Sequence, residues 1–284
     1  MRVPLGLVAL AVVAAPSAAP AQSYRTLVES RRLDRKEAVH VSVNFAVGRF
    51  RLVPGGTAEL YRVGLTYLDE QFEPDVSYDP QDGMLRIDLE GRHEREVHLK
   101  DLDDTRQRLD LALSPEVPLQ LDLSFGAVQA EVELGGLTLQ SASLETGASE
   151  TIVRFSQPNR AACDDLTLQV GAAEFEVIGL GNSRCRSVDL KGGVVEITLD
   201  FSGEWAPGAE MRVSADVGLG DVHFRVPEAV GVRLNLDRFL VSLQLDGFTK
   251  RGSTWYSAGY DRAAVKLLVD LNSAFGSIEV DWIR

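Results

Sequence analysis

Residues 121–134 read LDLSFGAVQAEVEL, and their pattern recurs along the chain. Apolar and polar residues alternate on both sides of a small central pair, Gly126-Ala127. Residues 166–177 (LTLQVGAAEFEV) and 188–199 (VDLKGGVVEITL) have the same design. Alternation with a period of two predicts a strand with one buried face, and a small residue inside a strand predicts a bend or a close backbone approach. The chain is therefore expected to repeat a unit of strand, small-residue corner and strand.

The central small residue recurs at a nearly constant interval. Successive corners are 21 to 25 residues apart as far as Phe239, and a last interval of 35 residues contains an apparent insertion at residues 247–260. The predicted corner residues are Gly126, Gly147, Gly171, Gly193, Gly218, Phe239 and Ala274. A self-similar unit of this length is typical of solenoids, propellers or arrays. The constancy of the interval argues against a sandwich of unrelated strands.

The chemistry of the unit favours a solenoid. Glycine permits a sharp turn and lets the backbones of neighbouring units approach closely. Each unit has one apolar face that it cannot bury alone, so neighbouring units must stack. Stacked strands lie about 4.8 Å apart, so seven units would make a rod of roughly 30 Å. The predicted fold class is all-β, a β-solenoid or β-helix-like stack of repeated strand–Gly corner–strand units with a small N-terminal β module.

The two cysteines occupy the same place in consecutive units. Cys163 lies 8 residues before Gly171, and Cys185 lies 8 residues before Gly193. Equivalent positions of stacked units lie within the Cα separation that a disulfide tolerates. We therefore expect a Cys163–Cys185 bridge, which contributes about 3 kcal/mol in the chain-entropy model. Two buried free thiols are the alternative, and a redox pair is disfavoured because no C-x-x-C motif is present.

The first residues resemble a secretory signal. Arg2 precedes a short apolar run at residues 5–15, and residues 19–21 (APA) fit a small-x-small cleavage site. We expect a signal peptide at residues 1–21, with a retained anchor as the alternative. The protein is then exported, to the periplasm or to the outside of the cell. No later segment has the roughly 18 apolar residues of a membrane helix, so no stable membrane insertion is expected.

The remaining chain is expected to have three parts. Residues 22–38 are charged and weakly patterned, and they are predicted to be a flexible arm, with a short helix as the alternative. Residues 39–113 alternate and contain the turn sequence DPQDG at residues 79–83, which predicts a small N-terminal β module. Residues 114–284 are predicted to form the solenoid repeats.

Composition limits the class of partner. The hydrophobic content of 45% supports a packed core, and 29 Lys or Arg against 42 Asp or Glu give a formal net charge of −13. An acidic chain is a poor ligand for nucleic acid or for anionic lipid. The expected partner is an envelope protein or a cell-wall component, with no nucleic acid.

No motif predicts catalysis. His93 and His98 lie in HEREVH, whose spacing places the two rings on opposite faces of a strand. No phosphate-binding loop and no nucleophile-elbow sequence occurs. Several carboxylates are expected to point outward without any pair standing out, namely Glu131, Glu133, Glu174, Glu176, Glu196 and Asp221. We therefore expect no catalytic residue, no cofactor and no metal site, and the chain is not expected to be an enzyme.

The insertion at residues 247–260 is rich in aromatic residues for a chain that is only 7% aromatic. It contains Phe248, Trp255, Tyr256 and Tyr260. Aromatic side chains on a loop can form a recognition surface. Alternatively, they cover the open end of the repeat array, because terminal repeats need capping.

These patterns resemble a known family. Residues 115–134 (PEVPLQLDLSFGAVQAEVEL), 189–203 (DLKGGVVEITLDFSG) and 273–282 (SAFGSIEVDW) resemble bacterial toast-rack proteins, which are related to the C-terminal domain of LiaF-type cell-wall stress proteins. Residues 41–56 (VSVNFAVGRFRLVPGG) resemble the N-terminal toast-rack module. The resemblance covers roughly residues 39–284 and implies a non-enzymatic envelope protein, linked in relatives to adhesion or to sensing of cell-wall-active antibiotics. LiaF-type proteins carry membrane helices before this domain, whereas here only a signal peptide is expected.

Three functions follow from the sequence. The leading hypothesis is a non-enzymatic extracytoplasmic module with a structural, adhesion or envelope-stress interaction role. The first alternative is a polysaccharide-active β-helix enzyme, which would need two carboxylates flanking a cleft. The second alternative is an outer-membrane β-barrel, and the low aromatic content and the outward-facing acids count against it.

Overall fold

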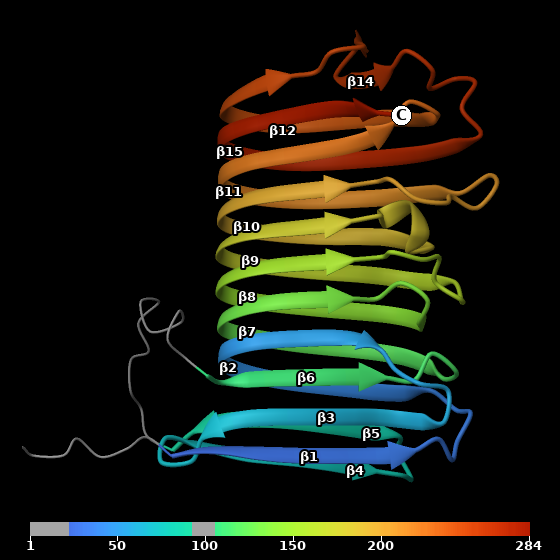
Figure 1. Ribbon diagram of the computed structural model, residues 1–284. Coiled ribbons are helices and arrows are strands. Elements are labelled where there is room, and N and C mark those ends of the chain that lie inside the picture. Colours follow the sequence, from blue (N-terminus) through green and yellow to red (C-terminus); the bar gives the residue numbers. More distant parts are fainter. Residues whose placement is uncertain (1–22, 93–105) are drawn as a thin grey trace, which may run out of the picture.

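The computed structural model describes residues 23–92 and 106–284. Within these ranges the chain forms one 15-stranded sheet, and Figure 1 shows its strands stacked one above the other. The predicted signal peptide, residues 1–21, lies outside the described residues, and so do His93 and His98. The predicted all-β, solenoid-like stack is confirmed.

The sheet follows the order β1-β3-β6-β2-β7-β8-β9-β10-β11-β15-β12-β14-β13, with β4 and β5 paired beside this path. The strands are β1 (Tyr24–Arg32), β2 (Val39–Pro54), β3 (Glu59–Leu68), β4 (Phe72–Asp79), β5 (Met84–Gly91), β6 (Arg108–Leu113), β7 (Pro118–Glu133), β8 (Thr138–Arg154), β9 (Cys163–Ile178), β10 (Cys185–Asp200), β11 (Glu210–Pro227), β12 (Val230–Gln244), β13 (Phe248–Arg251), β14 (Thr254–Ser257) and β15 (Val265–Ile283). A short 3-10 helix, η2 (Leu180–Asn182), precedes β10.

Each long strand bends back at its middle, on one side of the stack (Figure 1). In the parallel pair of β10 and β11, Gly192 is opposite Val217 and Val194 is opposite Leu219. The two predicted corner glycines lie between these pairs, one on top of the other. The same register holds from β7 to β11, so the repeat counted in the sequence is the repeat of the structure.

Close stacking explains why the corners are small. A Cβ atom at Gly171 would lie 2.7 Å from the carbonyl oxygen of Gly147, and one at Gly193 would lie 2.8 Å from that of Gly171. Both distances are shorter than a Cβ atom can reach without moving the neighbouring backbone. A corner that has another unit stacked against it therefore excludes a side chain.

The core fills the space between the two halves of each bent strand. The burial of β7 alternates along its length, as expected for a strand with one face inward. Phe50, from the second half of β2, meets Phe125, from the first half of β7, with 4.7 Å between the ring centroids. The stack therefore encloses a continuous apolar interior, which no single unit could form alone.

The predicted disulfide is present. Cys163 and Cys185 are opposite each other at the start of β9 and β10, and their sulfur atoms are bonded at 2.04 Å. Their Cα atoms are 4.1 Å apart, as expected for equivalent places in neighbouring units. The bridge joins two consecutive units of the stack.

The order of the last two units differs from the order of the sequence. β15 inserts between β11 and β12, so the Ala274 corner stacks on the Gly218 corner and Phe239 forms the outermost corner. The side chain of Phe239 is 72% exposed. Because no strand lies over this corner in the described chain, a large residue fits where the inner corners require a small one.

The predicted flexible arm is wrong for residues 24–32. They form β1, which pairs antiparallel with β3, and Leu27 packs against the core. The hydroxyl of Tyr61 on β3 donates a hydrogen bond to Oε1 of Glu29 at 2.6 Å. The sequence does not predict this strand because it is an edge strand in which six of the nine side chains are polar or charged.

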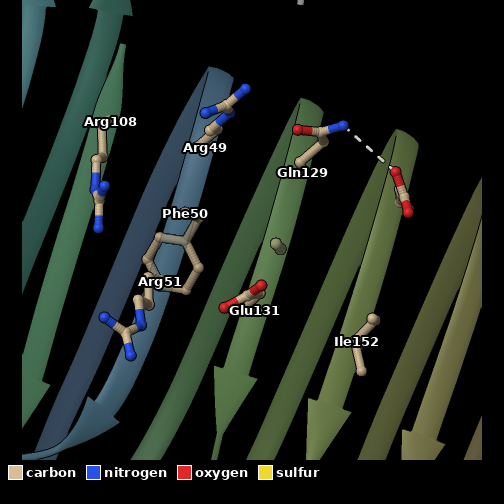
Figure 2. Close-up of a pocket in the computed structure, with 9 residues that line it drawn as sticks. Arg49, Phe50, Arg51, Arg108, Gln129, Glu131 and Ile152 are labelled. Carbon is tan, nitrogen blue, oxygen red and sulfur yellow. Dashed lines mark hydrogen bonds between the residues drawn. The ribbon is translucent and has the colours of Figure 1, made fainter. Parts of the chain in front are cut away.

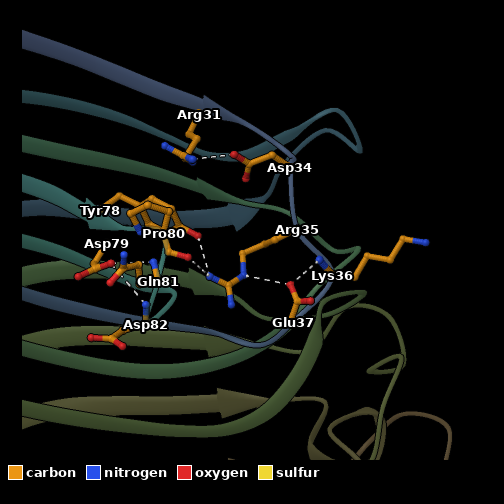
Figure 3. A network of polar contacts seen from close by, with 10 residues as sticks. All are labelled: Arg31, Asp34, Arg35, Lys36, Glu37, Tyr78, Asp79, Pro80, Gln81 and Asp82. Carbon is orange, nitrogen blue, oxygen red and sulfur yellow. Dashed lines mark hydrogen bonds and ion pairs between the residues drawn. The ribbon is translucent and has the colours of Figure 1, made fainter.

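The segment after β1 is held by a polar network, which Figure 3 shows. Arg31 donates to Asp34 at 2.6 Å, and the guanidinium of Arg35 donates to the hydroxyl of Tyr78 at 3.2 Å and to the carbonyl of Pro80 at 3.3 Å. The segment that was expected to be flexible is therefore tied to the turn between β4 and β5.

The predicted N-terminal module is continuous with the repeats. One edge of β2 pairs with β7 from Val39 to Leu52, and the other edge pairs first with β5 and then with β6. β2 bends at Ala46 and is itself a unit of the stack. The division at residues 113 and 114 remains a prediction, because the sheet crosses it without a break.

Candidate functional site

Exposed apolar side chains line one corner of the stack near its C-terminal end. They follow directly after the corner residues of β10, β11, β15 and β12, and we call them the corner ridge. The ridge consists of Val194, Leu219, Phe275 and Leu240, which are 59%, 49%, 43% and 63% exposed. Each is opposite the next in the sheet register. Phe239 borders the ridge, with its ring 5.9 Å from that of Phe275 in an edge-on contact.

The ridge is confined to one part of the stack. The same column holds the buried Val47 on β2 and Ala127, Ala148 and Ala172 on β7, β8 and β9, so among the described strands large exposed side chains occur in it only from β10 onward. Contiguous exposed apolar surface marks interaction sites on soluble proteins. The predicted sites did not include this surface, although the increase in side-chain size at one repeat position is visible in the sequence.

An open groove of about 620 Å³ runs beside the ridge. Its polar wall includes Asp216, Asn272 and Asp237, and the amide of Asn272 donates to Oδ1 of Asp216 at 2.7 Å. Its apolar side includes Phe239 and Ala274. The ridge therefore has a polar border, as protein interfaces commonly have.

The predicted aromatic loop is an ordered hairpin. β13 and β14 pair with each other, and β14 pairs with residues 233–235 of β12, so the hairpin lies at the end of the stack (Figure 1). Phe248 stacks on Trp282, with 5.5 Å between the ring centroids, and packs against the core as Trp255 does. These contacts place the hairpin over the end of the array.

The other aromatic residues of the hairpin contact cations and each other. Lys250 lies 5.4 Å from the ring of Trp255, and Arg251 lies 5.0 Å from the ring of Tyr256. The rings of Tyr256 and Tyr260 are 5.0 Å apart and meet edge-on. All four predicted aromatic residues are half-buried, so the structure brings them together at the cap, and a recognition role for them remains a prediction.

A second depression, of about 350 Å³, lies on the outer face of β2, β6, β7 and β8 (Figure 2). Arg49 is opposite Arg108 on β6 and Gln129 on β7, and Arg51 is opposite Glu131. Asp110 binds the guanidinium of Arg108 through two hydrogen bonds of 2.6 and 2.7 Å and thereby raises its pKa. Basic and acidic groups are mixed on this exposed surface, where Arg108 is paired with Asp110 and Arg51 is opposite Glu131.

Carboxylates form a column on the outer face of the stack. Glu150, Glu174, Glu196 and Asp221 are opposite one another on β8, β9, β10 and β11, and we call them the acidic column. Like charges in directly opposite positions repel each other. The column lies on an outward sheet face, and no pair within it is set apart for acid–base chemistry.

The described histidines each lie beside one carboxylate. Nε2 of His40 is 2.5 Å from Oδ2 of Asp122, and Nδ1 of His223 is 3.3 Å from Oε2 of Glu279. Among the residues that the structure describes, no three His, Cys, Asp or Glu side chains gather as metal ligands would. Within residues 23–92 and 106–284, no helix has the length and apolar character needed to cross a membrane.

Several solved structures are similar to this chain. A candidate cell adhesion protein from Clostridium sporogenes matches with 14% identity and a TM-score of 0.46, covering 92% of this chain and 100% of the other. A candidate adhesin from Bacteroides fragilis matches with 12% identity and a TM-score of 0.43, covering 92% and 98%. At these values the likeness decides neither fold nor function. No curated protein matches the chain.

A family model gives the firmer result. The model described as the N-terminal domain of toast_rack, DUF2154, matches residues 18–178, which is more than half of the 284 residues. The matched region contains β1 to β9, and thus both the strands before the repeats and the first repeats themselves. This chain therefore belongs to the toast-rack family.

Proposed function

We propose that this protein is a non-enzymatic, extracytoplasmic interaction module that binds a partner of the cell envelope through its corner ridge. The observation that supports this proposal is the alignment of four exposed apolar side chains on consecutive strands of a rigid stack. Leaving such side chains in water forgoes about 25 cal/mol for each Å² of apolar surface. A partner that covers them recovers this free energy.

The proposed compartment is the periplasm or the exterior of the cell. The Cys163–Cys185 bridge supports it, because disulfides persist in oxidising compartments. Export by a signal peptide at residues 1–21 is part of the proposal. The partner is an envelope protein or a cell-wall component rather than a nucleic acid, in keeping with the net charge of −13.

The role within the envelope is the finer part of the proposal. Residues 179–284 lie beyond the region that the family model matches. The resemblance of residues 39–284 to toast-rack proteins, which are related to LiaF-type domains, supports a role in adhesion or in the response to cell-wall-active antibiotics. The corner ridge starts at Val194 and therefore lies wholly within this C-terminal part.

Binding to fractionated envelope material tests the proposal. The chain is immobilised and exposed separately to envelope proteins and to purified cell wall, beside the double variant Val194→Ser/Leu219→Ser. Val28→Ser is the matched control, because Val28 is 70% exposed but lies on β1. We expect the ridge variant to lose the retained component and the control to keep it. Equal retention by all three proteins, or hydrolysis of the cell wall by the chain, would contradict the proposal.

A further inference from the structure

The outer edge of β12 is the open end of the stack. On one side β12 pairs with β15 along nearly its whole length, but on the other side only residues 233–235 are paired, with β14. Among the described residues, no strand lies against residues 236–244 on that side. We propose that this edge pairs with the same edge of a second copy of the chain and forms a two-fold symmetric dimer. The dimer goes beyond the proposed function, because it needs no other envelope component.

The side chains at this edge are suited to burial. Phe239 and Leu240 are both more than 60% exposed, and they occupy the outermost corner of the stack. An unpaired strand edge with apolar side chains is a template for another strand. Pairing would satisfy the free backbone groups of the edge and would cover both side chains.

The edge lacks the protection that the other end of the sheet has. Natural edge strands are usually blunted by charged side chains. On this edge only the guanidinium of Arg238 is in a comparable position, and its Nη1 donates a hydrogen bond to the carbonyl oxygen of Val241 at 2.9 Å. The following residues, 242–245, read SLQL and carry no charge.

The charge of the C-terminal end favours a second copy of the chain as the partner at this edge. The whole chain has 29 basic and 42 acidic residues, whereas residues 230–284 have seven basic and six acidic residues. Two copies therefore repel each other over most of their surface but not at this end. A two-fold axis is the commonest symmetry of soluble oligomers, and it brings the same surface of both copies together.

When two copies of the edge run antiparallel, a basic residue of one copy can lie opposite an acidic residue of the other. Arg238 lies before the apolar run and Asp246 lies after it, and both are exposed. With the two-fold axis at Ser242, Arg238 of one copy faces Asp246 of the partner subunit, and the pair occurs twice. Within one chain Arg238 lies before the bend at Phe239 and Asp246 lies seven residues after that bend, which is roughly 23 Å at about 3.3 Å per residue, so they do not pair internally.

The size of the edge sets the strength of the dimer. A ladder over residues 240–244, with the Phe239 side chains packed beside it, is smaller than the roughly 1,600 Å² of a standard stable interface. We therefore expect a weak dimer, with a dissociation constant of about 10 μM. Its population should change with protein concentration.

Sedimentation velocity of the chain without its predicted signal peptide tests the dimer over a wide range of concentrations. We expect a monomer–dimer equilibrium, and we expect Phe239→Lys/Leu240→Lys to raise the dissociation constant at least about tenfold, equivalent to 1.4 kcal/mol. Both substitutions are on exposed side chains, so the fold should be retained. Val28→Lys is the control and should dimerise like the unchanged chain. A monomer at every concentration, or a dimer that the edge variant leaves intact, would overturn the proposal.

A charge exchange tests the two-fold register. Arg238→Asp and Asp246→Arg alone should each weaken the dimer, because each places like charges opposite one another. The double variant Arg238→Asp/Asp246→Arg should restore it, while far-ultraviolet circular dichroism checks that each variant is folded. If the folded double variant dimerises no better than the single variants, the antiparallel two-fold arrangement is wrong.

Discussion

The two ends of the stack are closed in different ways. At the N-terminal end, β1 covers β3 and presents a charged outer edge, and the segment after it is tied down by the Arg31 and Arg35 network (Figure 3). At the C-terminal end, the β13–β14 hairpin covers only the first half of β12. The second half stays open and carries Phe239 and Leu240.

This difference indicates that the N-terminal end closes the stack, whereas the C-terminal end is suited to contact another molecule. Both ends expose backbone groups of an edge strand, but β1 carries four charged residues along its length, whereas residues 239–245 of the C-terminal edge carry none and only Arg238 precedes them. The corner ridge extends from β10 to β12 and therefore ends at the same open edge. The apolar surface and the open edge therefore belong to one region of the molecule.

The largest effect should come from placing a side chain at an inner corner. Gly171→Ala puts a Cβ atom 2.7 Å from the carbonyl oxygen of Gly147, so the neighbouring backbone must move. We expect a loss of about 3 kcal/mol in the free energy of unfolding, measured by urea denaturation. Phe239→Ala, at the uncovered corner, should stay within about 0.5 kcal/mol. Similar losses for both would show that the end corner is packed like an inner one.

The hairpin should contribute measurably to the stability of the C-terminal end. Trp255 packs against the core and under Lys250, so Trp255→Ala should lower the free energy of unfolding by about 2 kcal/mol. Thr249→Ala, on the exposed face of β13, is the control and should have little effect. An unchanged stability for Trp255→Ala would mean that the aromatic residues do not act as a cap and would favour a recognition role.

The protonation of Tyr61 should make the free energy of unfolding depend on pH. Burial first, and then its hydrogen bond to Glu29, raise the pKa of Tyr61 above its ordinary value. Above a pH of about 10 an unfolded tyrosine loses its proton while the folded one keeps it, so the free energy of unfolding should fall as the pH rises. Tyr61→Phe should lower stability by about 1 kcal/mol at neutral pH and make this fall shallower. An equally steep fall in the variant would assign it to other groups.

The smallest effect should be a gain in the free energy of unfolding when one carboxylate of the acidic column is neutralised. Glu174 lies between Glu150 and Glu196, so Glu174→Gln should raise the free energy of unfolding by about 0.5 kcal/mol at low salt. Glu176→Gln is the matched control on the same face, because Glu176 lies between Ile152 and Thr198. If both substitutions act alike, repulsion within the acidic column is not the cause. The gain should shrink as salt screens the column.

Local pattern was enough to predict the repeating part of the fold. The glycine interval gave the corners and their register, because only small residues fit where backbones stack. The register in turn predicted the Cys163–Cys185 bridge. These features depend on neighbours within one repeat length.

The ends could not be predicted in the same way. Six of the nine residues of β1 are polar or charged, so its pattern does not resemble that of a core strand. The insertion of β15 between β11 and β12 depends on where a distant strand finds its partner, and the sequence order alone implies the opposite. The corner ridge was not predicted because Leu219 and Phe275 resemble core residues in the sequence, whereas at the bend their side chains point outward.

Hydrogen exchange at low and high protein concentration tests most directly whether the C-terminal end is the contact end. We expect the amides of residues 239–244 to exchange rapidly in dilute solution and to become protected as the concentration rises, while β1 stays unchanged. Protection that rises at β1 instead, or no change at either end, would contradict the assignment of the open edge as a contact.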